Sequence, residues 1–101
     1  MSFIFIYVTA SSQKEAKNIA GIVIKKRLAA CANIFPISSM YKWKGKICEE
    51  KEWVLILKTT KNKSILAKKE IEKIHSYQVP CIMEISVNPN KKYRKWMENQ
   101  L

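Results

Sequence analysis

The chain has 101 residues, of which 48% are hydrophobic and 27% charged, which fits one folded domain, 1–101, and excludes a disordered chain. Lysine and arginine total 19 against 8 aspartate and glutamate, a formal net charge of +11. The lysines are spread along the chain, and Arg27 and Arg94 are its two arginines. We therefore expect a solvated basic surface and no specific nucleic-acid binding.

Three cysteines, Cys31, Cys48 and Cys81, occur without CxxC spacing, which favours neither a disulfide framework nor a zinc motif. A reducing compartment is the simplest interpretation, so we expect a cytoplasmic protein. The apolar run at 3–8 is too short to span a membrane and has no basic flank or cleavage site. We therefore expect a strand there and no membrane association.

Residues 2–9 are rich in Phe, Ile, Tyr and Val, as in a central strand covered on both faces. Ser11 and Ser12 offer a helix N-cap, with Glu15 completing a capping box. The buried stripe of this first helix is predicted to be Ala16, Ile19, Ala20, Val23 and Arg27 to Leu28.

The stretch from Cys31 to Trp43 is β-like, and Pro36 within it indicates an edge, a bend or a bulge. Gly45 then supplies a turn, so the pattern predicts a long hairpin whose second arm ends in the apolar run 53–57.

Asn62 or Ser64 can cap a second helix, which Pro80 stops on this interpretation. Its buried stripe is Ala67, Ile71 and Ile74. A strand at Ile82–Val87 follows. The chain then forms a terminal helix with Tyr93, Trp96 and Met97 on one side.

The order β-α-β-β-α-β plus a C-terminal helix predicts an α+β, ferredoxin-like fold with an antiparallel sheet. Its second and third strands form the long hairpin. Because this fold hosts many activities, it predicts no function by itself.

The composition argues against two kinds of catalytic site. The chain has no aspartate and one histidine, which excludes a Ser-His-Asp arrangement, and Gly21 and Gly45 form no phosphate-binding loop. These two kinds of site are therefore excluded, and we predict no catalytic residues.

The densest group of potential metal ligands is His75 with Cys81, followed by Glu84. Imidazole, thiolate and carboxylate are ligand types for soft or borderline transition metals, although this spacing fits no established motif. The alternative is a loop histidine that hydrogen-bonds locally and a cysteine that serves as a small apolar residue.

The aromatic content is high for one small domain: Tyr41, Trp43, Trp53, Tyr77 and Trp96. Stacked bases would need a basic groove beside these rings. We favour an oligomer interface, in which the hairpin pairs with a neighbouring sheet edge.

Several motifs together resemble the divalent-cation tolerance (CutA) family over nearly the whole chain. They are residues 27–34, Pro36, 41–47, 52–59 and 75–80, with Tyr93 and Trp96 in the tail. The resemblance implies a homotrimer with a PII-like fold and assembly, in which the second and third strands make intersubunit contacts. It also implies a role in tolerance of divalent cations, copper above all, and no enzymatic reaction.

On this resemblance, a metal ion or a small ligand binds in clefts between subunits. The cleft candidates are Tyr41, Trp43, Lys58, His75 and Tyr77. The metal candidates are His75, Cys81 and Glu84, with copper or another divalent cation. The alternative is a PII-like signalling or scaffold trimer with no direct metal role.

Three positions depart from the family pattern. Cys81 stands where members usually carry glutamate, Ser76 replaces the usual proline, and Val8 stands where some bacterial members have a cysteine. These changes predict that any copper site differs from the family's and uses Cys81 beside His75.

Overall fold

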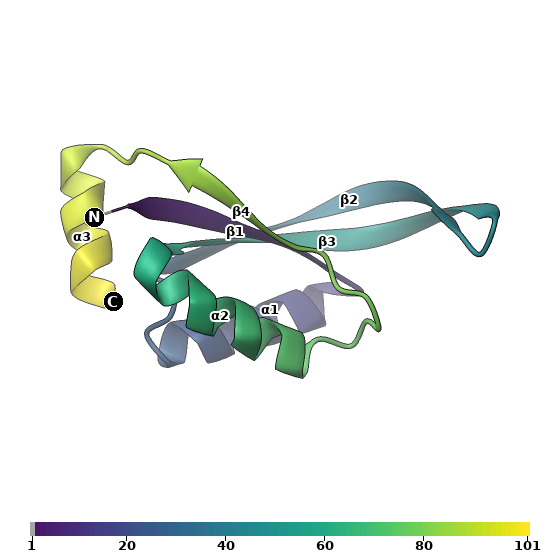
Figure 1. The fold of residues 1–101 in the computed structure, drawn as a ribbon, viewed down its shortest axis with the longest axis horizontal. Coiled ribbons are helices and arrows are strands. Elements are labelled where there is room, and N and C mark those ends of the chain that lie inside the picture. The colour runs from purple at the N-terminus through teal and green to yellow at the C-terminus, as the bar shows by residue number, and fades with distance from the viewer. Residues whose placement is uncertain (1) are drawn as a thin grey trace.

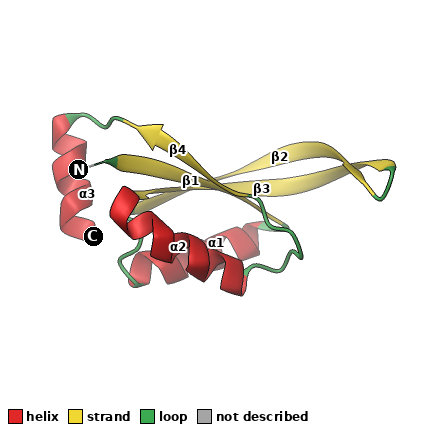
Figure 2. Ribbon diagram, viewed as in Figure 1, coloured by secondary structure: helices red, strands yellow, loops and turns green. Residues whose placement is uncertain are grey.

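The computed structural model describes residues 2–101 and contains four strands and three helices. They are β1 (Phe3–Ala10), α1 (Gln13–Lys25), β2 (Cys31–Trp43), β3 (Lys46–Thr60), α2 (Lys61–Ile74), β4 (Ile82–Val87) and α3 (Lys91–Gln100). The strands form one antiparallel sheet in the order β2-β3-β1-β4, and α1 and α2 lie on one face of it (Figures 1 and 2). The predicted α+β, ferredoxin-like arrangement is confirmed.

The core lies between the sheet and the two helices α1 and α2. Alternate residues of β1 face the helices and are fully or almost fully buried: Ile4, Ile6, Val8 and Ala10. The helices contribute Ala16, Ile19, Ala20, Val23, Ala67 and Ile71. The predicted helical stripes therefore form this core, because residues three and four apart share one face of a helix.

The C-terminus of α1 corrects one prediction. The Leu28 N–H donates to the Val23 carbonyl and the Arg27 N–H to the Ile24 carbonyl, both at 2.9 Å, which is a Schellman motif. Arg27 has φ 59° and is exposed beyond the helix end. Arg27 is therefore not part of the buried stripe, whereas Leu28 is buried.

The start of α1 is capped through Glu15. Ser12 Oγ accepts a hydrogen bond from the Glu15 N–H at 3.0 Å, as the capping box predicts. The Glu15 carboxylate accepts from the N–H and hydroxyl of Ser11, at 2.9 and 2.8 Å, and from the Ser76 N–H at 2.9 Å. Glu15 thus ties the loop after α2 to the beginning of α1.

Both predicted boundaries of α2 are wrong. The N-cap is Thr60, whose side chain makes no capping hydrogen bond, and the hydroxyl of Ser64 donates to the Lys61 carbonyl inside the first turn. The helix ends at Ile74, where the next residue becomes extended, so Pro80 lies too far along the chain to stop it.

The hairpin of β2 and β3 extends beyond the rest of the sheet (Figure 1). The last pair of β1 with β3 joins Ala10 and Trp53, whereas β2 and β3 remain paired as far as Trp43 and Lys46. We call this two-stranded extension the arm. Pro36 lies in β2, the edge strand, so the edge is the correct one of the three predicted alternatives.

The sheet face opposite α1 and α2 is covered at one end by α3. Met97 of α3 packs with Phe3 there. Elsewhere this open face presents Phe5, Tyr7, Phe35, Met83 and Ile85, of which Met83 and Ile85 are 52% and 47% exposed. One chain thus covers β1 fully on its helix side only, not on both faces as predicted.

Phe3 of β1 and Leu101, which follows α3, belong to one cluster, and the tip of the arm lies at the opposite end of the molecule (Figure 1). The longest dimension of the molecule is 46 Å.

Candidate functional site

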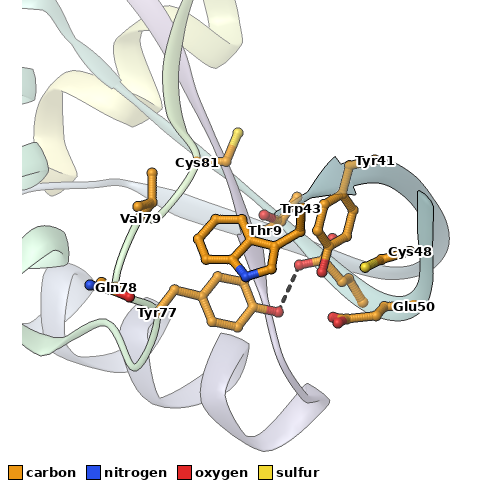
Figure 3. A pocket seen from close by; sticks show the side chains of 10 residues that line it. Thr9, Tyr41, Trp43, Cys48, Glu50, Tyr77, Gln78, Val79 and Cys81 are labelled. Atoms are coloured by element: carbon orange, nitrogen blue, oxygen red, sulfur yellow. Dashed lines mark hydrogen bonds between the residues drawn. The ribbon is translucent and has the colours of Figure 1, made fainter. Parts of the chain in front are cut away.

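A cavity of about 420 Å³ lies where the arm leaves the sheet, and we call it the arm pocket (Figure 3). It is lined by Thr9, Tyr41, Trp43, Cys48, Glu50, Glu52, Tyr77, Gln78, Val79 and Cys81. The arm contributes one side, and the loop between α2 and β4 contributes the other. The pocket therefore depends on how that loop is held against the end of β1.

His75 holds the loop in place. Its side chain is buried; Nδ1 accepts a hydrogen bond from the Tyr77 N–H at 3.0 Å, and Nε2 lies 2.8 Å from the Thr9 carbonyl oxygen. Since Nδ1 is the acceptor, the proton is on Nε2, which donates to Thr9. The bond with Tyr77 is local, as in the alternative interpretation, whereas the bond with Thr9 joins distant parts of the chain. His75 does not line the pocket, but it binds Thr9 and Tyr77, which do.

Glu52 is the most buried charged group of the pocket. It is 7% exposed, and Oε2 accepts a hydrogen bond from the Tyr77 hydroxyl at 2.7 Å (Figure 3). Burial and this hydrogen bond raise the pKa of Tyr77. Within residues 2–101, neither Glu52 nor Glu50 forms an ion pair with a lysine or arginine. A negative charge therefore lines the pocket in a strongly basic chain.

Two free thiols, Cys48 and Cys81, also line the pocket. Burial and the charge of Glu52 raise the pKa of the Cys81 thiol, and a hydrogen bond with Thr9 lowers it by less. Because the net effect is a raised pKa, this thiol is protonated at neutral pH. Among the residues described, no three or more His, Cys, Asp or Glu side chains gather closely enough to hold a metal ion. One subunit alone thus supplies donors without a complete metal site.

The predicted metal candidates do not come together. Glu84 lies on the helix side of the sheet, where Oε2 is 2.6 Å from Lys61 Nζ and Oε1 is 2.8 Å from Lys68 Nζ. Hydrogen bonds from these two lysines lower the pKa of Glu84 to about 2. Cys81 lines the arm pocket instead, and His75 is engaged through both ring nitrogens.

The predicted cleft candidates are divided between two places. Tyr41, Trp43 and Tyr77 line the arm pocket. Lys58 lines a second cavity of about 230 Å³ at the other end of the sheet, below α3. There its Nζ is 3.4 Å from the Tyr93 hydroxyl and 5.1 Å from the centre of the Tyr93 ring.

Sequence reasoning missed the pocket roles of Cys48, Glu50 and Glu52. These residues alternate along β3, so their side chains point to one face, and Tyr41 lies opposite Cys48 in the register. The two-residue turn at Lys44 and Gly45 fixes that register. Counting residues back from this turn would have placed the carboxylates beside the aromatic rings.

The fold and the pocket define a class: a small ferredoxin-like protein with a projecting hairpin and an acidic, aromatic pocket at its base. The family model for the CutA1 divalent ion tolerance protein matches residues 4–100. The chain belongs to the CutA1 divalent ion tolerance family.

Individual relatives agree with this assignment. A divalent-cation tolerance protein CutA of Archaeoglobus fulgidus is 42% identical over 95 residues, with 93% of each chain covered, and that of Thermotoga maritima is 37% identical over 99 residues, with 97% and 98% covered. The solved A. fulgidus structure has a TM-score of 0.94 at 40% identity and 97% coverage of both chains. That of CutA1 from Oryza sativa has 0.95 at 34% identity, covering 99% and 94%. These names describe tolerance of divalent cations and specify no reaction.

The relatives are not all assigned to one compartment. The A. fulgidus structure is described as periplasmic, and a rice relative is described as chloroplastic. Within residues 2–101, no helix has the length and apolar character needed to cross a membrane. A cytoplasmic location stays a prediction for this chain.

Proposed function

We propose that the protein acts in divalent-cation tolerance as a homotrimer that binds a divalent cation, copper first among them, in the arm pocket. The observation that supports this proposal is the buried Glu52 carboxylate, which within residues 2–101 has a hydroxyl partner and no cationic one. A buried charge without a counter-ion is costly, so a cation in the pocket would offset that cost.

The donor types in the pocket suit copper better than they suit magnesium or calcium. Thiolates of Cys48 and Cys81 are soft ligands, whereas Glu50 and Glu52 offer harder oxygens. Because a thiol must lose its proton to bind metal, and the pKa of Cys81 is raised, we expect binding to strengthen as the pH rises.

Trimer formation would cover the apolar surface of the open face and complete the pocket. Beyond the pair of Ala10 and Trp53, β3 has no β1 partner, so one edge of the arm is free to pair with another copy. Met40 and Ile47 of the arm are 69% and 73% exposed. A neighbouring copy would bury such side chains and could add the ligands that one subunit lacks.

Copper titration tests the proposal. We expect saturable binding to the wild-type protein and an affinity at least about tenfold lower in Cys81→Ala, which loses a thiol ligand. His75→Ala should also weaken binding, since it releases the loop that carries Tyr77 and Cys81. Cys31→Ala is the matched control, because Cys31 does not line the arm pocket and should leave the affinity unchanged.

Unchanged copper affinity in both Cys81→Ala and His75→Ala would contradict the proposed metal site. A stable trimer that binds no divalent cation would instead favour a PII-like signalling or scaffold role. The projecting arm supports that second candidate, because it offers an exposed element to a partner protein. Such a scaffold would keep its partners when metal is removed.

A further inference from the structure

The arm pocket contains more aromatic surface than a metal site uses. In a single copy of the chain, Tyr41 and Trp43 are 38% and 45% exposed, and Tyr77 supplies a third ring from the opposite side (Figure 3). Aromatic carbon atoms do not ligate divalent cations. The rings therefore point to a ligand with a larger surface than that of a bare ion.

The charge of the pocket limits what that ligand can be. Glu50 and Glu52 line it, and no lysine or arginine is among its lining residues. An anion would be repelled by these carboxylates, and a neutral ligand would leave Glu52 without a counter-ion. A hydrogen bond with Glu50 also raises the pKa of the neighbouring Tyr41 hydroxyl to about 12.

Aromatic faces combined with carboxylates favour organic cations. The face of an aromatic ring carries partial negative charge and attracts an ammonium group placed over it, most strongly when the ring is that of tryptophan. A cavity of about 420 Å³ is within the range that suits a small organic molecule. The aromatic surface, the negative charge and the volume of the pocket thus all favour a small organic cation.

We propose that the arm pocket binds a small alkylammonium compound, with its cationic head group among Tyr41, Trp43 and Tyr77 and beside Glu52. This inference rests on the pocket of the proposed function and uses its carboxylates, but it requires neither thiol. Copper and the organic cation would therefore compete for the same space while depending on different side chains.

Choline is a suitable probe, and calorimetric titration measures its affinity. We expect saturable choline binding, and binding about tenfold weaker for 3,3-dimethyl-1-butanol, which has the same shape without the charge. Glu52→Gln and Trp43→Leu should each lower choline affinity about tenfold. Because Trp43 is exposed, its replacement tests the pocket even if Glu52→Gln disturbs folding.

Two control variants match these changes. Trp96→Leu removes an indole that is 42% exposed but lies on α3, and Glu72→Gln removes an exposed carboxylate on α2. Both should bind choline like the wild type. Titrating the wild-type protein with copper alone separates this inference from the metal proposal, because the choline titration contains no metal.

Three results would overturn the inference. One is equal affinity for choline and its uncharged analogue, which would mean that the pocket is merely apolar. Another is unchanged choline binding in Trp43→Leu. The last is absence of choline binding to the intact wild-type assembly, as expected if a lysine of a neighbouring copy fills the pocket. A wild-type protein that binds choline but not copper would contradict the metal proposal and support this inference.

Discussion

Glu15 connects parts of the chain that are far apart in sequence. Its carboxylate accepts hydrogen bonds from Ser11, at the start of α1, and from Ser76, in the loop that forms one side of the arm pocket. Burial raises the pKa of Glu15, but the hydrogen bonds from Ser76 and Ser11 outweigh burial, and the pKa falls from 4.5 to about 2.

This pKa predicts how stability depends on pH. A carboxylate whose pKa is lower in the folded state stabilises the fold fully above its unfolded value of 4.5, and this contribution is lost as the pH falls toward about 2. Glu15→Gln, which cannot titrate, should be less stable than wild type at neutral pH and should lose less stability between neutral pH and about pH 3. Urea unfolding at both pH values measures the difference, with the exposed Glu72→Gln as control. An equally steep loss in Glu15→Gln would contradict this role.

The site residues show which contacts a sequence can predict. The sequence singled out His75, but its hydrogen-bond partner Thr9 is 66 residues away, and only the folded sheet brings them together. Glu84 was a reasonable metal candidate by residue type. Strand alternation places it on the same side as Ile82, facing α2, where lysines pair with it. The residue types of His75 and Glu84 therefore suggested what these side chains could bind, whereas the folded sheet determines which groups they contact.

At the scale of elements, the turn of the hairpin carries local strain. Lys44 has φ 50° and Gly45 has φ 80°, so both turn residues are left-handed, as in a type I′ turn. This conformation suits glycine and asparagine but costs a lysine energy. The arm, which provides half of the pocket, is thus held by a turn that is not optimal.

Lys44→Asn should relieve this strain and raise the free energy of unfolding by about 0.5–1 kcal/mol. Gly45→Ala should act in the opposite direction and lower it by about 1–2 kcal/mol. Denaturant unfolding curves measure both changes, with Lys42→Asn as a control outside the turn. A Lys44→Asn variant that is less stable than the wild type would contradict the prediction that the left-handed conformation of Lys44 is strained.

The secondary structure was predicted well along the chain, whereas the ends of α2 were not. The chain passes directly from the last residue of β3, Thr60, into the helix. The N–H of Lys61 donates to the carbonyl of Ser2 at 2.9 Å, so a neighbouring strand satisfies a group that a capping side chain would otherwise serve. Such a contact between distant segments leaves no local pattern in the sequence, and the search for a capping residue found Asn62 and Ser64 instead.

At the scale of the molecule, the open face predicts association. We expect light scattering to give the mass of three subunits for the wild-type protein. Met83→Lys places a charge in the middle of this face and should shift the protein toward single subunits, because burying an unpaired charge is costly. Leu66→Lys is the matched control, since Leu66 is 58% exposed on α2 and faces away from the sheet. A folded wild-type protein that stays a lone subunit at micromolar concentration would contradict the trimer.

Phe3 and Leu101 pack in one cluster with Met97 of α3, whereas the arm, which lines the arm pocket, projects from the other end of the sheet (Figure 1). A fluorescent reporter or an affinity tag fused at either end would therefore stand clear of the ligand. Labelled protein can be immobilised through that end for binding assays, with the arm directed away from the support.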